Sequence, residues 1–311
     1  MRSNINTEQI EGRIYQHNLS MKKVANEKSP NFGKTFINGT IDVATDEECL
    51  NVITVHYTYV TEQTKNNAAN PTFNNLKRII DSGKTVLMDG KDQAWKGRLN
   101  PSAALNDFYP QGQDELVSQP RHEGGFVSIV TELNPNENAR TKFTFDTLIT
   151  NVEHVEKDPD KGVESDFARI HCAIFNFKND ILPFTLIMKN PDGIKYFENL
   201  GASNAEPVYT QVWGNISNKT VSVYKETESA FGEPSVDTVR RLVREWIVTG
   251  AKANPYDFGD LEVMTVEDVK KAIQNRELAL AEIKKRSNEY YASKKTDATT
   301  NTSIPTGGFN F

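Results

Sequence analysis

Residues 167–177 read Phe-Ala-Arg-Ile-His-Cys-Ala-Ile-Phe-Asn-Phe, and this stretch decides the fold. Its side chains fall into two alternating rows. One row holds Ala168, Ile170, Cys172 and Ile174, and the other holds Arg169, His171, Phe175 and Phe177. A period of two over this length predicts a strand with one face in a core.

The residues that follow predict further short elements. Residues 178–180 form a tight connection, and residues 181–189 alternate again, with an apolar row of Leu182, Phe184, Leu186 and Met188. Pro191 and Asp192 are typical of a helix start and Gly201 of a helix end, so a short helix is expected over residues 193–200. Residues 207–216 and 239–250 predict two more strands.

An apolar alternation over residues 143–155 adds a strand in front of this set. The predicted order is then strand, strand, strand, helix, strand, strand. This order resembles the OB-fold, a five-stranded, partly open barrel that binds oligonucleotides or oligosaccharides on one face. The resemblance rests on element order and strand patterning, because no short motif defines this fold.

The first half of the chain repeats part of this order. Strands are predicted over residues 31–43, 49–60 and 84–88, with a helix over residues 71–81. A first strand is expected within residues 11–24, residues 91–120 read as a long inserted segment, and residues 124–130 as a closing strand. We therefore predict a mainly β chain with two tandem OB-fold-like five-stranded barrels, each with a short helix.

The expected domains follow from this order. The first barrel, with its inserted segment, spans residues 1–133, and the second spans residues 139–258. Thr265-Val-Glu-Asp268 resembles a helix capping box with Asp in place of Glu. It begins an amphipathic helix over residues 265–295, which packs on a barrel or, as the alternative, self-associates as a short coil. Residues 296–311 are expected to form a disordered tail, because their composition is polar and of low complexity.

Composition restricts the class of protein. No apolar run approaches the ~20 residues that span a bilayer, and the polar N-terminus does not resemble a signal peptide. Cys49 and Cys172 are the two cysteines, and we expect free thiols in a cytoplasmic protein. The net charge of −6 counts against a protein that coats nucleic acid non-specifically. However, much of the acid is concentrated in residues 153–166, which leaves room for a local basic groove.

No catalytic or metal-binding motif emerges. Gly33-Lys34-Thr35 and Gly83-Lys84-Thr85 lack the upstream Gly of a phosphate-binding loop, since those positions hold Lys28 and Arg78. The histidines and cysteines show no metal-ligand spacing. We therefore expect neither an enzyme nor a cofactor.

Basic and aromatic residues share the non-core rows of the predicted strands. Single-stranded nucleic acid is held by Lys and Arg together with aromatic faces, and each stacked base contributes ~1–3 kcal/mol. The candidates in the second barrel are Arg169, Phe175, Phe177, Lys178, Tyr209, Trp213, Arg240, Arg241 and Arg244, and those in the inserted segment are Trp95, Lys96, Arg98 and Tyr109. For each aromatic residue among them, the alternative to a binding role is burial in the core. For the neighbouring Trp246, core burial is at least as well supported as binding.

The C-terminus suggests a second kind of contact. Bacterial single-stranded-DNA-binding proteins combine an OB-fold, a disordered linker and a tail that ends in Phe and docks on partner proteins. This chain resembles them in ending with Phe309-Asn-Phe311, but it departs from their acidic tip, since only Asp297 is acidic after Glu289. The resemblance implies that Phe309 and Phe311 bind replication or recombination proteins.

Two stretches, residues 167–189 and Phe231-Gly-Glu-Pro-Ser235 through Trp246-Ile-Val-Thr-Gly250, are similar to a two-barrel family of phage and mobile-element proteins from Gram-positive bacteria. This resemblance implies sequence-tolerant binding of single-stranded DNA in replication or recombination. The alternative from a different class is a structural or assembly β-protein of a virus particle. A carbohydrate-binding barrel is a third and weaker interpretation.

Overall fold

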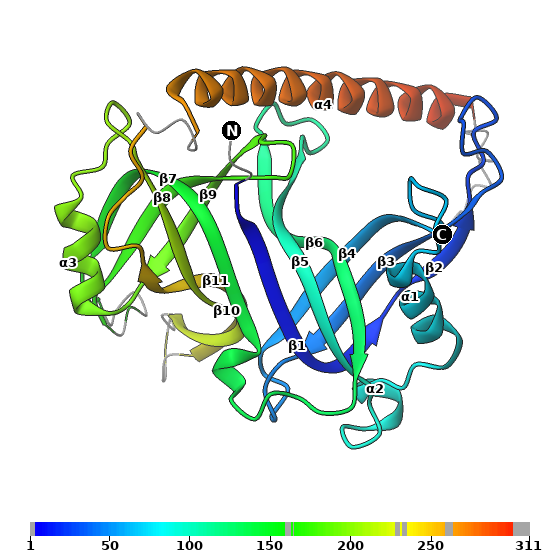
Figure 1. The fold of residues 1–311 in the computed structure, drawn as a ribbon, viewed down its shortest axis with the longest axis horizontal. Helices are drawn as coiled ribbons and strands as arrows, with labels where there is room; N and C mark the ends of the chain where they lie inside the picture. Colours follow the sequence, from blue (N-terminus) through cyan, green and yellow to red (C-terminus); the bar gives the residue numbers. More distant parts are fainter. Residues whose placement is uncertain are drawn as a thin grey trace.

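The computed structural model describes residues 4–158, 163, 165–227, 231, 235–258 and 264–300, with side chains for all of these except 221–227, 235–241 and 293–300. Within these residues, eleven strands join into one hydrogen-bonded sheet. Two additional pairings close this sheet into two rings of strands, which lie side by side beneath a long helix (Figure 1).

The first ring uses the first half of the chain. It consists of β1 (Asn6–His17), β3 (Thr35–Ala44), β4 (Val52–Thr61), β5 (Lys96–Phe108) and β6 (Val117–Val130). β1 pairs with β3 and β5, β3 with β4, and β5 with β6, all antiparallel, whereas β4 and β6 are parallel. The short β2 (Ser20–Lys23) pairs with the start of β3. Two helices, α1 (Pro71–Ser82) and α2 (Val86–Asp89), lie between the third and fourth strands of the ring.

The second ring repeats this topology. It consists of β7 (Thr141–Val155), β8 (Phe167–Phe175), β9 (Ile181–Met188), β10 (Val208–Thr227) and β11 (Ser235–Ala251), with α3 (Pro191–Asn199) after the third strand. β7 pairs with β8 and β10, β8 with β9, and β10 with β11, all antiparallel, whereas β9 and β11 are parallel. When the strands of each ring are numbered in chain order, neighbouring strands pair in the order 1-2-3-5-4-1. In both rings, helix lies between the third and fourth strands. The predicted mainly β fold with an OB-like element order is confirmed.

Alternation explains the core of the second ring. All four members of the predicted apolar row on β8 are buried, and so are all four on β9. α3 begins where the sequence indicates: Pro191 occupies its first turn, and the Asn190 side chain accepts hydrogen bonds from the backbone N–H groups of Asp192 and Gly193. Ile194 and Phe197 of α3 are buried against this core.

Two predictions for the first ring are wrong. Residues 84–88 do not form a strand, because Thr85 caps α2: its hydroxyl accepts from Met88 N, and its own N–H donates to Asp89. Residues 91–120 are not an insertion, because they contain β5 and the start of β6. β5 has few large apolar residues, and Pro101 lies at an irregularity in its pairing with β6. Pairing with a neighbour on each side holds it in the sheet.

The two rings share a strand contact and a buried polar network. β1 pairs with β7 over Asn6–Ile10 and Thr141–Phe145. The carboxylate of Glu8 on β1 lies 2.8 Å from Nδ1 of His122 on β6 and accepts a 2.7 Å hydrogen bond from Trp246 Nε1 on β11. All three side chains are buried. The network therefore joins both rings through their interior.

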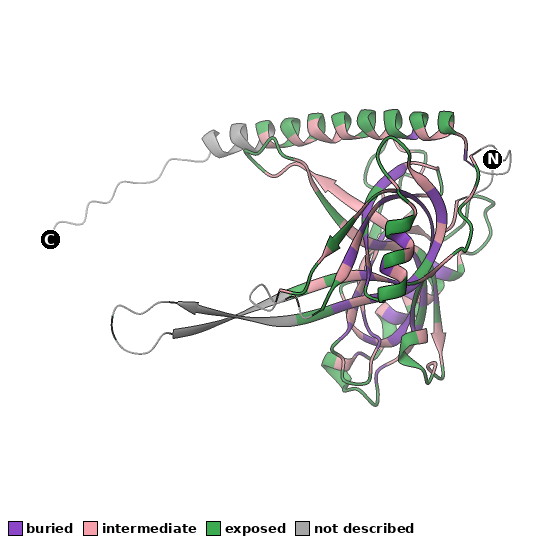
Figure 2. Ribbon diagram, turned by 90° about the vertical axis from the view of Figure 1, so that its left-hand side faces the viewer, coloured by how far each residue is buried: buried purple, intermediate pink, exposed green. Residues whose placement is uncertain are grey.

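The long helix α4 (Val266–Thr300) spans both rings and keeps most of its surface exposed (Figure 2). The predicted capping box is confirmed, since Thr265 and Asp268 exchange hydrogen bonds. Met264 and Ala272 pack against the second ring, and Arg276 donates two 3.2 Å hydrogen bonds to Asp107 at the end of β5. The helix extends five residues beyond the predicted end at residue 295.

The Glu8 network predicts an unequal response of two tryptophans to the same substitution. Trp246→Phe removes the donor to a buried carboxylate and should lower the free energy of unfolding by about 1–3 kcal/mol. Trp213→Phe changes a side chain that is 40 % exposed and should cost less than about 0.5 kcal/mol. Urea unfolding of both variants measures the difference, and equal losses would mean that the hydrogen bond to Glu8 contributes nothing.

Candidate nucleic-acid interface

A groove of about 560 Å³ lies between the rings. Its lining comes from β8, β9 and β11 of the second ring, with Thr150 of β7, and from the β5–β6 hairpin of the first, which contributes Leu105, Ser118 and Pro120. β8 and β9 are the second and third strands of their ring. In OB-folds, this face of the barrel binds oligonucleotides and oligosaccharides.

Strand alternation places the polar side chains of this groove. On β8, Ala168 and Ile170 are fully buried, so Arg169 and His171 face outward into the groove. On β9, Thr185 also faces the groove, because its neighbours Phe184 and Leu186 are buried. Period-two patterning thus turns Arg169 and His171 of β8 outward, together with a mixed row of Pro183, Thr185 and Ile187 on β9.

A charged cluster lies at one end of the groove. Arg169 Nη1 lies 3.1 and 3.2 Å from the two carboxylate oxygens of Glu153 on β7, and His171 Nε2 lies 3.3 Å from the same group. The Arg169 guanidinium also lies 5.4 Å from the ring centroid of Phe167. Hydrogen bonds from Arg169, and then from His171, lower the pKa of Glu153. All three side chains of the cluster remain partly accessible, so a phosphate could compete with Glu153 for Arg169.

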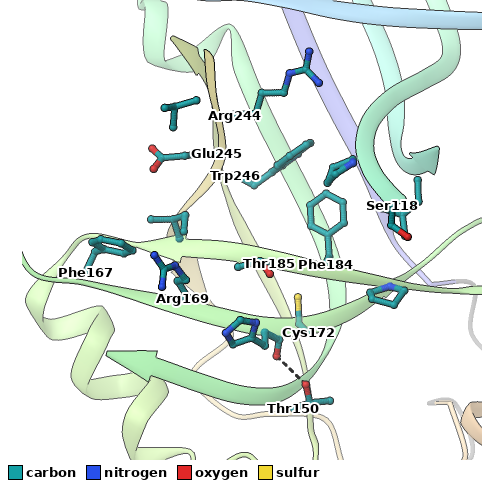
Figure 3. Close-up of a pocket in the computed structure, with 16 residues that line it drawn as sticks. Ser118, Thr150, Phe167, Arg169, Cys172, Phe184, Thr185, Arg244, Glu245 and Trp246 are labelled. Atoms are coloured by element: carbon teal, nitrogen blue, oxygen red, sulfur yellow. Dashed lines mark hydrogen bonds between the residues drawn. The ribbon is translucent and has the colours of Figure 1, made fainter. Parts of the chain in front are cut away.

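Arg244 faces the groove from β11. Figure 3 shows Arg244 and Arg169 on opposite sides of Trp246. Trp246 is fixed by its hydrogen bond to Glu8, and Lys189 forms a 2.7 Å ion pair with Glu245 next to it. Two arginines therefore flank a rigid, largely apolar floor, an arrangement that can hold phosphates on both sides of a base.

Two of the sequence-predicted aromatic contacts are buried instead. Phe175 is fully buried, and Tyr209 is 3 % exposed. Both belong to a second apolar cluster that the chain after β11 covers, through Tyr256, Phe258 and Met264. The prediction that Phe175 and Tyr209 form part of an exposed stacking surface is therefore wrong, because a distant segment closes over the face that alternation left open.

The remaining second-ring candidates lie outside the groove. Phe177 and Lys178 are exposed in the β8–β9 turn, where the Lys178 ammonium lies 5.6 Å from the Phe177 ring centroid. Trp213 is on β10, and its indole covers Gly250 so closely that a Cβ there would lie 2.4 Å from Nε1. Trp213 thus presents a fixed, partly exposed ring on another side of the barrel.

The candidates from residues 95–109 are dispersed around the first ring. Trp95 precedes β5 and packs partly against the core, with the Arg78 guanidinium 5.8 Å from its ring centroid. Lys96 donates to the Thr131 carbonyl, and Arg98 is paired with buried Glu11 at 2.7 Å. Tyr109 lies beneath α4, which contacts it through Lys284 and Ser287. None of these four residues lines the groove.

The other predictions concern residues that the structure describes in part or not at all. Arg240 and Arg241 lie on β11, but their side chains are outside the described part of the chain. Phe309 and Phe311 also lie outside the described residues.

Sequence reasoning missed three groove residues as binding candidates, namely Phe167, His171 and Thr185. A signal existed for His171, because the alternation of β8 places it on the same face as Arg169. Glu153 belongs to the acidic stretch 153–166 that the sequence sets beside a basic groove, but its contact with Arg169 depends on the β7–β8 register.

The contrast between Phe175 and Phe177 predicts opposite results for two phenylalanines at one strand end. Phe175→Ala should lower the free energy of unfolding by about 3–5 kcal/mol, because a buried ring is lost from a packed cluster. Phe177 is 86 % exposed, and its replacement by Ala should change stability by less than about 0.5 kcal/mol. Chemical denaturation followed by circular dichroism tests the pair, and a stable Phe175→Ala variant would contradict the packing.

None of the described helices combines the length and apolarity that a bilayer crossing requires. Within the same residues, no three His, Cys, Asp or Glu side chains are grouped so that they could hold a metal ion. Cys49 and Cys172 are free, and burial raises the pKa of the Cys172 thiol.

Comparisons with known proteins add the family. A search of curated proteins finds no match. Among solved structures, a deletion mutant of the single-stranded DNA binding protein from Thermus aquaticus is similar at 10 % identity and a TM-score of 0.46, covering 83 % of this chain and 98 % of that one. The wild-type protein gives 9 % identity and a TM-score of 0.43, covering 81 % and 93 %. These values are too low to carry an argument about function.

The profile of the YorF family, by contrast, matches residues 5–286. The chain belongs to the YorF family.

Proposed function

We propose that this chain binds single-stranded DNA in the groove of the second ring, without sequence preference and without catalysis. One observation carries the proposal: arginines and apolar side chains line the same groove, on the face where OB-folds hold their ligands. Base stacking tolerates any sequence, and phosphate contacts are independent of the base. The mixed lining therefore fits a backbone-and-stacking mode of binding.

Individual residues have distinct roles in this proposal. Arg169 and Arg244 bind phosphates, and His171 assists on the side of Arg169. Phe167 is half-buried beside Arg169 and offers a face for stacking. Arg240 and Arg241 precede Arg244 on β11 and remain predicted phosphate contacts.

The biological role is a further part of the proposal. We place binding in DNA replication or recombination in the cytoplasm of a bacterial cell, in a protein of the phage and mobile-element type. The resemblance of residues 167–189 and 231–250 supports this role. The C-terminal residues Phe309 and Phe311 remain proposed contacts for partner proteins.

Binding should depend steeply on salt. Fluorescence anisotropy of a labelled oligo-dT should show tight binding at low salt that weakens as counterions compete, with a slope of ~0.7 per phosphate contact. Arg169→Gln and Arg244→Gln should each reduce the affinity at low salt by roughly tenfold, because a charge-assisted hydrogen bond is lost. Each should also reduce the slope by ~0.7.

Arg286→Gln is the matched control, since it removes the same charge from an exposed position on α4. This variant should bind like the unmodified protein, and a duplex of equal length should bind more weakly. Affinity that does not change with salt would exclude the mechanism. If no binding occurred, the alternative of a structural or assembly protein of a virus particle would be favoured. Sedimentation would then be expected to show large homo-oligomers.

Replacement of Glu153 should have the opposite effect and increase the affinity for DNA. Because its carboxylate occupies Arg169 and His171, Glu153→Gln should free both side chains for phosphate and raise the affinity several-fold. Glu198→Gln is a control, because Glu198 pairs with His154 rather than with a groove residue. Unchanged binding by Glu153→Gln would show that Glu153 does not compete with DNA, and weaker binding would show that it orients Arg169.

A further inference from the structure

The outer face of the first ring carries an aromatic side chain that simple alternation would bury. On β4, every second side chain from Ile53 to Tyr57 is buried, and Tyr59 would continue this row. A β-bulge intervenes, in which Thr58 and Tyr59 together lie opposite the single residue Asn38 of β3. A bulge re-aims the side chains next to it, and Tyr59 is 45 % exposed.

The bulge brings Tyr59 against Phe36 of β3. Their ring centroids are 4.7 Å apart, and their planes are tilted by 39°. Lys22 on β2 is the direct cross-strand partner of Phe36, so its exposed side chain lies on the same face of the sheet. Two accessible rings beside a lysine are the combination that holds bases and phosphates of a single strand.

Charged side chains connect this face with the groove. His56 lies on the outward row of β4, and Arg244 of the groove acts on it electrostatically. Burial lowers the pKa of His56 most; Arg121, His122 and Arg244 lower it further, whereas Glu123 raises it. Glu123 is itself held by Arg121 at 2.8 Å and by a hydrogen bond from the Thr58 hydroxyl. Pro120, which lines the groove, immediately precedes Arg121 on β6. β6 pairs with β4 through His122–Val55 and Glu123–His56, so this strand leads from the groove to the outer face of β4.

Direct hydrogen bonds fix the two rings to each other at the start of β4. Asn51, next to β4, accepts a 2.7 Å hydrogen bond from Asn218 N on β10 and donates to the Ile216 carbonyl. Asn218 in turn donates to the Val52 carbonyl. β11, which carries Arg244, pairs with this part of β10. The position of Arg244 relative to the start of β4 is thus set by the fold.

We propose that Phe36, Tyr59 and Lys22 form a second stacking site for the same DNA strand, which runs from the groove past Arg244 onto the outer face of the first ring. This inference rests on the proposed function and adds the path of the strand. It assigns a binding role to the first ring and predicts a site longer than one barrel can cover.

The test is a length series of oligo-dT from about 6 to about 30 nucleotides, because one OB-fold covers ~4–16 nucleotides. The affinity of the unmodified protein should rise with length until both sites are spanned. The double variant Phe36→Ala/Tyr59→Ala should reach its plateau at a shorter length and bind the longest strand at least tenfold more weakly. Tyr59→Phe retains a ring and should bind like the unmodified protein.

Two controls keep the outcomes separate. Tyr290→Ala removes a similarly exposed ring from α4 and should leave the length series unchanged. Photocrosslinking of a halogenated strand to the unmodified protein should label the peptide that contains Tyr59, whatever the stability of the variants. If the double variant matched the unmodified protein and no label reached β4, the second site would be excluded while groove binding stood. If the unmodified protein bound no strand, both proposals would fail.

Discussion

The buried carboxylate of Glu8 is the interaction on which the arrangement of the two rings depends. A buried charge is costly unless it is paired and hydrogen-bonded. Glu8 obtains its partners from the final strand of each ring, His122 from β6 and Trp246 from β11. Both partners are in place only when both rings are closed and lie in this relative orientation. Trp246 also lines the groove, so the same interaction fixes the groove floor.

Strand register explains how a chain with a net negative charge can present a basic groove. The net charge is −6, but charge acts locally in physiological salt, over a Debye length of about 8 Å. The β8 row and β11 place Arg169 and Arg244 in one groove, and Glu153 is the carboxylate that contacts Arg169 directly. Overall composition therefore says little about this surface, because strand register decides which charges meet.

The same reasoning shows what the sequence could and could not predict. Alternation on β8 and β9 predicted their buried rows and the outward position of Arg169, because a period of two depends only on neighbouring residues. Burial of Phe175 and Tyr209 could not be predicted in this way, since their cover comes from distant residues, among them Tyr256, Phe258 and Met264. β5 was missed because its pairing partners, rather than its own side chains, hold it in the sheet.

Tyr59 shows most clearly how register can override pattern. Its place in the sequence continues a buried row, and only one extra residue on β4 relative to β3 turns it outward. An unbulged strand would bury Tyr59 beside Tyr57, which is already 1 % exposed, and would leave Phe36 without its aromatic neighbour. The bulge interrupts the β-ladder hydrogen bonding and passes the inward position to Val60, which pairs with buried Ile37 and packs partly against the core. Tyr59 is thereby left outside the core, where the proposed second stacking site would use its ring.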